Sequence, residues 1–297
     1  MDKETDIFSH QAAFFPWQPA AWLRVTGEDA FTFLQGQFTN DLRALQAVPA
    51  VYGLWLNHKG RVVADSFVVK GSSGEFWVGS YFVSASVIIE RLMSFILADD
   101  VVVENLTAQW RAATVFDLAT EARLTEIPGV LSFPGRRTAA PHREYVFPAE
   151  LESVVRVQLA SLTELGAKDM ERKRITAGIP AIPLDLSIGE LPNEGRLETS
   201  ALSYTKGCYL GQEVMARLKS MGQVRRRLLR VEGSGDIPIM PAALHQGERR
   251  IGELRTAVPT NTGFQGMALL SLLHLRPDDG LSLRPGEELA VKVIETP

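Results

Sequence analysis

The chain contains a single cysteine, Cys208, so no internal disulfide can hold its fold together. A fold without disulfides has to be stabilised by the burial of apolar side chains. The chain has 297 residues, 45% of them hydrophobic, which is enough to bury a large core and to form two or three domains. A lone thiol cannot supply all the ligands of a thiolate zinc cage or of a fully protein-ligated iron-sulfur cluster. We therefore expect a globular protein from a reducing compartment.

The cysteine lies in the octet Lys206-Gly207-Cys208-Tyr209-Leu210-Gly211-Gln212-Glu213. A lysine two residues before the thiol favours the thiolate, and a helix predicted to begin just after the thiol favours it further. The two glycines that flank Cys208 leave room for a close approach of the backbone to a ligand. The alternative is that Cys208 is a small buried hydrophobe, which is the commoner role of a single cysteine. The residues alone leave both interpretations open.

Charge and hydropathy exclude several classes of protein. The formal net charge is -4 and the pI is about 5.8, which is unlike a protein that coats nucleic acid. No apolar run reaches the length of about 18 residues that a membrane-spanning helix needs. Residues 1–6 are polar and acidic, whereas a secretory signal peptide begins basic and continues apolar. We expect a soluble cytoplasmic protein with no membrane partner and no direct contact with nucleic acid.

Hydrophobic periodicity changes repeatedly along the first part of the chain, as in a fold of mixed α and β structure. Alternating or continuous apolar runs predict strands at residues 23–26, 52–57, 61–69, 76–78, 101–103 and 114–118. Apolar residues at helical spacing predict helices at residues 30–36, 83–97 and 151–165. The segment 128–148 is rich in proline, glycine and arginine and is interpreted as an irregular crossing. Together these elements predict an α+β body of antiparallel sheets and helices.

The chain changes character near residues 221 and 222. From there on, short apolar runs at residues 228–231, 250–252, 267–270 and 289–294 are separated by Gly, Pro and Asn, which is typical of short strands in a small barrel. We therefore divide the chain into a body of residues 1–221, with two interleaved subdomains as one arrangement, and a C-terminal β-barrel of residues 222–297.

Motifs for metal, phosphate and serine-based chemistry are missing from the sequence. The five histidines are scattered without the spacing of metal ligands, so no metal site is predicted. The glycines fall at expected turns and form neither a P-loop nor a dinucleotide-binding motif. The sequence also lacks a nucleophile elbow. The segment around Cys208 is therefore the strongest candidate for chemistry.

That segment resembles the signature K-G-C-[FY]-x-G-Q-E of the YgfZ family, folate-binding proteins related to the T-protein, which is the aminomethyltransferase of the glycine cleavage system. Every fixed position of the signature is present. Shorter similarities follow in the family's order, at residues 27–42, 59–61 and 177–180 and in the terminal segment. The resemblance implies an aminomethyltransferase-like folate-binding body with a C-terminal β-barrel.

The resemblance also implies roles inside the octet. Cys208 is expected to be the working thiol, and Lys206 is expected to activate it. Gly207, Tyr209 and Gly211 belong to the motif, and Gln212 and Glu213 are expected to hold the turn.

Two positions are implied to stack on the rings of a folate. Trp22 lies close to a tryptophan near the chain start that family members use against the pterin or benzoyl ring. Where a second family tryptophan would fall, this chain has Met170, whose thioether can still lie against an aromatic ring. Ordinary packing is the alternative.

Asp65 is the carboxylate of greatest interest, because it aligns with a pair of aspartates in T-proteins. One of that pair orients the folate and the amine during methylene transfer, and here the pair is Ala64-Asp65. The remaining carboxylate is either an orienting base or a group that is solvated or paired with Lys59 or Arg61.

Five further polar residues complete the implied pocket. Gln37, Asn40 and Asp41 follow the first helix, where they can bond the edge of a pterin or cap the next helix. Asn193 and Glu194 loosely match a T-protein glutamate that grips the pterin ring, and a carboxylate can accept two hydrogen bonds from that ring.

The function implied by the resemblance is binding of tetrahydrofolate, or of a one-carbon derivative, in support of iron-sulfur cluster assembly or repair and of cluster-dependent tRNA modification. The expected partners are the reduced folate and iron-sulfur enzymes or cluster-assembly proteins. One alternative is a folate-dependent aminomethyltransferase or demethylase, against which the missing second aspartate and the short chain argue. Another is a thiol-dependent redox protein that needs no folate.

Overall fold

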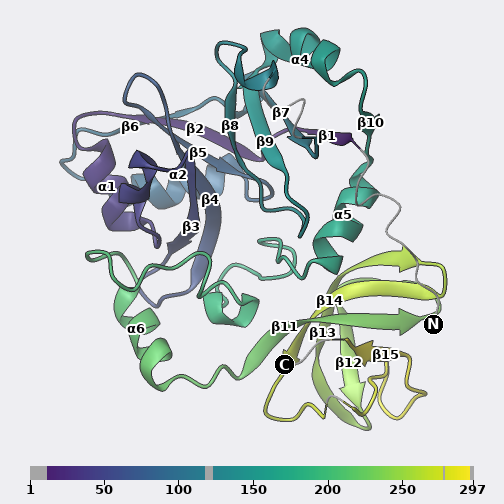
Figure 1. Cartoon of the computed structure of the whole chain (residues 1–297). Coiled ribbons are helices and arrows are strands. Elements are labelled where there is room, and N and C mark those ends of the chain that lie inside the picture. Colours follow the sequence, from purple (N-terminus) through teal and green to yellow (C-terminus); the bar gives the residue numbers. More distant parts are fainter. Residues whose placement is uncertain (1–11, 118–122, 277, 295–297) are drawn as a thin grey trace.

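The computed structural model describes residues 12–117, 123–276 and 278–294, which form three five-stranded sheets with helices around them (Figure 1). Two sheets belong to the body, and the third forms the C-terminal unit at the lower right of the view. The predicted α+β class is confirmed. Residues 1–6, whose composition argues against a signal peptide, lie outside the described residues.

The first body sheet is fully antiparallel and follows the predicted strands closely. Its strand order is β3-β4-β5-β2-β6, with bounds Ala50–Leu56 (β3), Val62–Lys70 (β4), Phe76–Ser80 (β5), Ala21–Thr26 (β2) and Val102–Asn105 (β6). The hairpin between β3 and β4 turns at Gly60, whose φ of 68° is easiest for glycine. The strands predicted at residues 23–26, 52–57, 61–69, 76–78 and 101–103 are confirmed.

The second body sheet contains most of what the sequence did not reveal. Its strand order is β10-β1-β7-β9-β8, with bounds Thr163–Glu164 (β10), Ala13–Trp17 (β1), Trp110–Val115 (β7), Arg143–Pro148 (β9) and Leu131–Pro134 (β8). The interpretation of residues 128–148 as an irregular crossing was wrong. Residues 143–148 pair with β7 on one side and with β8 on the other, so they form a regular hairpin strand.

Helices cover the outer faces of both body sheets. Their bounds, with the short 3-10 turns, are Ala30–Gln37 (α1), Leu42–Gln46 (η1), Ala85–Met93 (α2), Thr107–Gln109 (η2), Ala149–Leu151 (η3), Glu152–Leu159 (α4), Ala167–Thr176 (α5), Pro192–Gly195 (η4) and Gln212–Met221 (α6). The helix predicted at 83–97 ends at Met93, beyond which Leu97 is 90% exposed and faces no core. The helix predicted at 151–165 ends at Leu159, because residues 163–164 pair in parallel with β1.

The C-terminal sheet closes into a barrel, as predicted. Its strand order is β12-β13-β14-β11-β15, with bounds Ala242–Gln246 (β12), Arg249–Thr260 (β13), Gly263–Ser271 (β14), Arg226–Ser234 (β11) and Val291–Val293 (β15). Residues 281 and 282 bridge the two edge strands, because Ser282 pairs with His245 and Leu281 pairs with Val291. The boundary proposed between residues 221 and 222 falls at the end of α6, just before β11 begins.

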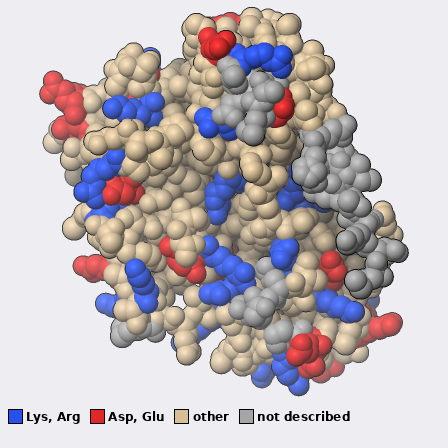
Figure 2. Space-filling model, viewed as in Figure 1, with Lys and Arg blue, Asp and Glu red and all other residues tan. Residues whose placement is uncertain are grey.

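The body and the barrel meet at α5. Ile175 of this helix packs against the barrel residues Leu228, Val258, Met267 and Leu269. Figure 2 shows that acidic and basic side chains are interspersed over the outer surface of this view, in keeping with the small net charge.

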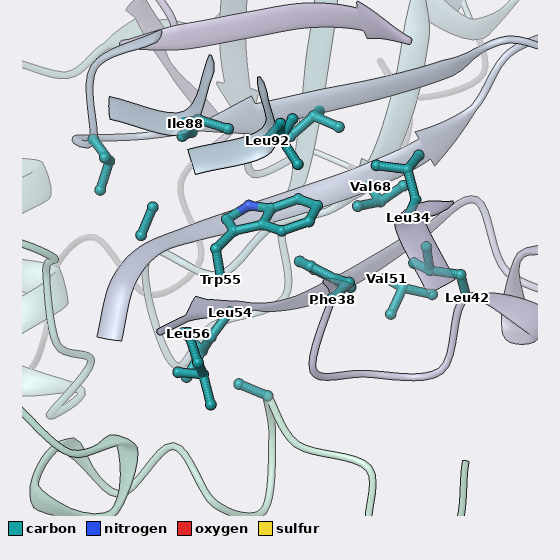
Figure 3. Close-up of a cluster of buried hydrophobic side chains, with 14 of the residues drawn as sticks. Leu34, Phe38, Leu42, Val51, Leu54, Trp55, Leu56, Val68, Ile88 and Leu92 are labelled. Atoms are coloured by element: carbon teal, nitrogen blue, oxygen red, sulfur yellow. The ribbon is translucent and has the colours of Figure 1, made fainter. Parts of the chain in front are cut away.

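Each body sheet buries apolar side chains on its faces. One cluster lies between the two sheets and includes Trp22 and Trp77 from the first and Trp110 and Phe133 from the second. A larger cluster lies between the first sheet and its helices, where the indole of Trp55 is enclosed by Ile88 and Leu92 on one side and by Phe38 on the other (Figure 3). The ring centroids of Phe38 and Trp55 are 4.8 Å apart. This packing fixes the chain just after α1, where the candidate site begins.

Candidate functional site

The octet around Cys208 forms an exposed loop that leads into α6. Cys208 is a free, exposed thiol, and Gly207 beside it is also exposed. The helix begins at Gln212, after Gly211, which has a φ of 86°. A Cβ atom at Gly211 would lie 2.9 Å from Asn57 O and 3.0 Å from the Cα of Gly60, so only glycine lets this loop approach the β3–β4 turn. The loop is therefore held tightly at one end while the thiol stays accessible.

Lys206 points into the protein and not toward the thiol. Its side chain is 4% exposed, and Nζ donates to the backbone oxygens of Gln35 and Phe38, both at 2.6 Å, and of Asn40 at 3.1 Å. An ammonium has three N–H donors, so these carbonyls use all of them. Burial lowers the pKa of Lys206 to about 8. The expectation that Lys206 activates Cys208 directly is therefore corrected, because the ammonium is committed to the turn after α1.

The other motif residues shape the loop. Tyr209 is 5% exposed and packs in the core cluster under the first sheet, and burial raises its pKa to about 12. The backbone N–H of Gln212 donates to Tyr209 O at 3.1 Å, which closes the turn before α6. Glu213 is exposed in the first turn of α6, where a carboxylate is favoured by the helix dipole.

Asp65 is buried on β4 and bonded to neutral groups. It accepts hydrogen bonds from Tyr52 Oη at 3.0 Å and from Ser80 Oγ at 3.2 Å. It is 4% exposed, and burial raises the pKa of its carboxyl, against the effect of the Tyr52 hydrogen bond. The guanidinium of Arg136 lies 4.3 Å from the centre of the Tyr52 ring. At 4% exposure Asp65 is not solvated, and of its two proposed partners Arg61 instead donates to Gly189 O.

The two predicted stacking residues are packed in the interior. Trp22 is 1% exposed and lies against Trp77 and Trp110, with ring centroids 5.8 and 5.6 Å away. Met170 is 4% exposed and packs with Ala13 and Leu165. The structure therefore corrects the expectation of an open ring face at Trp22, because the second sheet covers the face that would meet a ligand.

The polar residues at the end of α1 and in the turn after it bond mainly to the protein. Gln37 Oε1 accepts from Arg91 Nη2 at 2.9 Å. Asp41 caps η1 by accepting the backbone N–H of Arg43, so the capping alternative is the one the structure adopts. Hydrogen bonding to the Arg43 side chain holds the pKa of Asp41 well below its usual range. Asn40 Nδ2 donates to Tyr52 O at 2.9 Å, which links this turn to the partner of Asp65.

Asn193 and Glu194 lie on η4, where the body faces the barrel. Glu194 accepts the backbone N–H of Leu191 at 2.9 Å and the Nε of Arg226, on β11, at 2.9 Å. Asn193 is 6% exposed and bonds to Tyr204 in the segment that leads to Cys208. In this structure the Glu194 carboxylate thus holds the barrel to the body.

A buried carboxylate that sequence analysis missed lies between the two body sheets. Glu144 on β9 is fully buried and accepts hydrogen bonds from Trp17 Nε1 at 3.1 Å, Tyr81 Oη at 2.8 Å and Thr114 Oγ1 at 2.7 Å. The Arg137 guanidinium lies 3.8 Å from the centre of the Tyr81 ring and 3.5 Å from Glu144 Oε1. No spacing in the sequence marks these residues, because they come from three strands, from the bend after β5 and from the β8–β9 hairpin, which only folding brings together.

The β8–β9 hairpin and α5 enclose a cavity of about 250 Å³, lined by residues that include Thr138, Arg172, Lys173 and Thr176. Figure 2 shows Lys and Arg side chains in the middle of this face, around the place where the hairpin tip, α5 and β11 lie in Figure 1. Arg136, which stacks on Tyr52, is two residues from Thr138 along the same hairpin. The neighbourhood of Asp65 and the cavity are therefore connected through the hairpin.

Two negative findings apply to the described part of the chain. Within residues 12–117, 123–276 and 278–294, no group of three or more His, Cys, Asp or Glu side chains is placed to hold a metal ion. None of the helices in these ranges is long and apolar enough to cross a membrane.

Comparison with known protein families matches two parts of the chain. Residues 1–117 match the GCVT N-terminal domain, and residues 225–296 match the C-terminal beta-barrel domain of CAF17. Among full-length relatives, the chain is 29% identical over 287 residues to the human protein named iron-sulfur cluster assembly factor IBA57, mitochondrial, covering 87% of this chain and 79% of the relative. It is 26% identical to the tRNA-modifying protein YgfZ of Yersinia pseudotuberculosis, covering 89% and 86%. The chain is therefore similar, over most of its length, to proteins named IBA57 and YgfZ.

Two more matches complete the comparison. The IBA57 homolog of Mycosarcoma maydis is 27% identical over 256 residues, but the chain spans only 62% of that relative's length. The crystal structure of the glycine cleavage system aminomethyltransferase T from Bartonella henselae superposes with a TM-score of 0.79 over 96% of this chain and 86% of that one, at 16% identity. At that identity the match shows that this chain has the aminomethyltransferase fold, and it shows the fold alone.

Proposed function

We propose that this protein binds a reduced folate and supports iron-sulfur cluster assembly or repair, and through it cluster-dependent tRNA modification. The observation that carries the proposal is the exposed Cys208, presented by a complete family motif on an aminomethyltransferase-like body. Relatives named for iron-sulfur cluster assembly and for tRNA modification match the chain over most of their length. We further propose the cytoplasm as its location, although the IBA57 relatives are named as mitochondrial.

The folate site is proposed between β3, β4, the β8–β9 hairpin and α5. Asp65 supplies a carboxylate for the pterin or the bridging amine, and Tyr52 supplies an aromatic ring beside it. The cavity next to the hairpin carries Arg172 and Lys173, cations that suit the carboxylates of a folate's glutamate tail. Arg136 connects the two parts. This site replaces Trp22 and Met170 as the predicted stacking surface, because both are covered by protein.

Cys208 is proposed to act toward a partner and not toward the folate. Its exposure lets a macromolecule reach the sulfur. One thiol cannot hold a cluster by itself, so Cys208 can contribute a single ligand or nucleophile to a site completed by a client protein. The third class considered from sequence, a thiol-dependent redox protein, differs in requiring no folate.

Titration with tetrahydrofolate tests the folate part. A ligand that binds only the native state stabilises it by about 2.7 kcal/mol at a concentration one hundred times its dissociation constant. We expect measurable heat by calorimetry and a higher midpoint of thermal unfolding. Asp65→Asn and Arg136→Gln should weaken binding, whereas Arg111→Gln, a partly buried arginine paired with Glu152, serves as the matched control. Equal binding by all three variants would place the folate elsewhere.

Complementation of a strain that lacks its own family member tests the thiol part. Cys208→Ala should abolish support of cluster-dependent enzymes while the purified variant still binds tetrahydrofolate. Full complementation by Cys208→Ala would remove the thiol from the function.

Aminomethyl transfer is the second candidate, favoured by one observation. Asp65 is buried with a raised pKa, which suits a group that exchanges a proton with a bound amine. Because the second aspartate of the T-protein pair is Ala64 here, we expect little turnover of an aminomethyl-loaded lipoyl carrier protein with tetrahydrofolate. Formation of methylenetetrahydrofolate at T-protein rates would favour this candidate.

A further inference from the structure

Residues 35–40 leave helix α1 in a way that exposes backbone carbonyls. The helix ends at Gln37, and Phe38 has an extended backbone with φ of -86° and ψ of 142°. In a continuing helix, Gln35 O would accept the N–H of Thr39, but that N–H donates to Leu54 O at 3.1 Å instead. The negative end of the helix dipole points toward the same place. The turn after α1 therefore needs a donor from elsewhere, and a cation suits it best.

Lys206 supplies that donor from far along the chain. Its Nζ contacts three backbone oxygens of this turn, those of Gln35, Phe38 and Asn40. Asp41 and Arg43 are the charged side chains that act on the ammonium, and the Tyr209 ring centre lies 5.3 Å from it. An ammonium with one contact could serve packing alone. Three oxygens arranged around one nitrogen form a clamp between two segments.

Backbone bonds run alongside this clamp. Ser203 N–H donates to Thr39 O at 3.0 Å, and Thr39 Oγ1 donates to Ala201 O at 2.7 Å. The same turn touches the proposed folate site, because Asn40 Nδ2 donates to the backbone oxygen of Tyr52, whose phenol bonds to Asp65. The segment that carries Cys208 and the carboxylate of the folate site are thus attached to one short turn.

We propose that Lys206 is a positioning residue, which clamps the segment carrying Cys208 onto the turn after α1 and so fixes the thiol relative to Asp65. The inference rests on the proposed function, because only that function explains why the thiol should be fixed relative to Asp65. The clamp itself is a property of the free protein. The role depends on the donation of three hydrogen bonds by one cation, which an apolar side chain of the same length cannot provide.

Amide hydrogen exchange of Lys206→Met tests the clamp, because methionine keeps most of the side-chain volume and removes the donors. Exchange in peptides covering residues 200–211 should accelerate by about tenfold or more, while exchange in β13 and β14 of the barrel stays within about twofold of the parent. The matched control is Lys219→Met, on α6, which removes a different cation from the same segment, because its Nζ lies over the Tyr204 ring at 4.1 Å. Exchange at residues 200–211 should change much less in this control than in Lys206→Met. Lys206→Arg, which keeps charge and N–H donors, should return part of the protection.

Two results would overturn the clamp. Unchanged exchange at residues 200–211 in Lys206→Met would mean that the backbone hydrogen bonds hold this segment without the lysine. Equal acceleration of exchange throughout the body would mean that Lys206 is a general core contact and no clamp. If Lys206→Met does not fold, native-state exchange of the parent protein in mild urea decides. The clamp predicts that residues 35–40 and 200–211 open together with the same urea dependence, and independent opening contradicts it.

These measurements use neither folate nor a client enzyme, so the clamp can fail while the proposed function stands. Adding the complementation assay separates the reverse case. A Lys206→Met variant with a released loop that still complements fully would show that the function does not need Cys208 to be positioned. If the parent protein does not bind tetrahydrofolate, the folate site is refuted and the clamp is unaffected.

Discussion

Replacing Gly211 by alanine should destabilise the body much more than replacing Gly207, although both glycines belong to the same octet. Gly211 has a φ of 86°, and an added Cβ would lie 2.9 Å from Asn57 O and 3.0 Å from the Cα of Gly60, both of them backbone atoms that cannot rotate away. Gly207 has no positive φ, and an added Cβ there meets nothing within 4 Å. The difference between the two positions therefore isolates the fit of the loop against the β3–β4 turn.

The cost at Gly211 can be estimated from two contributions. The left-handed conformation costs a residue other than glycine roughly 1–2 kcal/mol. Overpacking against fixed atoms adds typically 1–3 kcal/mol, and the reduced entropy of the unfolded alanine chain returns about 0.4–1 kcal/mol. We expect Gly211→Ala to lose about 2–3 kcal/mol of unfolding free energy, and Gly207→Ala to change it by no more than about 1 kcal/mol in either direction.

Urea denaturation followed by tryptophan fluorescence provides the measurement. All five tryptophans lie between residues 17 and 110, so the signal reports the body and not the barrel. A Gly211→Ala variant within about 0.5 kcal/mol of the parent would refute the reasoning, because it would mean that the loop and the β3–β4 turn can separate without cost.

Three further outcomes are expected. Arg174→Met should lose about 3–5 kcal/mol of unfolding free energy in urea denaturation, because it strands Asp185, which is fully buried, whereas the double variant with Asp185→Asn should regain part of the loss. Asp65→Asn should gain stability relative to the parent as pH rises from about 4 to about 7. In the parent, the raised pKa of Asp65 gives a stabilising contribution that is present below the unfolded pKa and is lost as pH rises through the folded pKa, whereas asparagine does not titrate. Urea midpoints at both pH values check the sign, and a parent that gains on the variant would contradict it. Cys208→Ser should keep its thermal midpoint within a few degrees, and the parent thiol should react with iodoacetamide under native conditions; an inert thiol would contradict its exposure.

Local periodicity was sufficient for the elements whose apolar pattern is strong. Residues 61–69 and 76–78 form strands whose side chains fill both faces of a buried sheet. Their nearly continuous apolar runs predict such strands directly. The same method failed at residues 128–148, where prolines and glycines hide a hairpin. Residues 143–148 form a strand because their backbone pairs with the edge of β7, and no local sequence pattern predicts that pairing.

The candidate site divides in the same way. The tight glycine turn of the octet could be expected from the order of residues, because glycine allows a close approach of the backbone. The residues alone left open whether Cys208 is exposed or buried, and the structure shows that it is exposed. The surroundings of Trp22, Glu144 and Asp65 could not be expected, because burial depends on which sheet covers which face. Lys206 shows the limit most clearly: its ammonium bonds to Gln35, 171 residues away, and not to the thiol two residues away. The sequence determines which groups a chain carries. Which groups a buried lysine bonds to depends on the tertiary structure, because its ammonium donates to the backbone carbonyls that packing leaves without another donor.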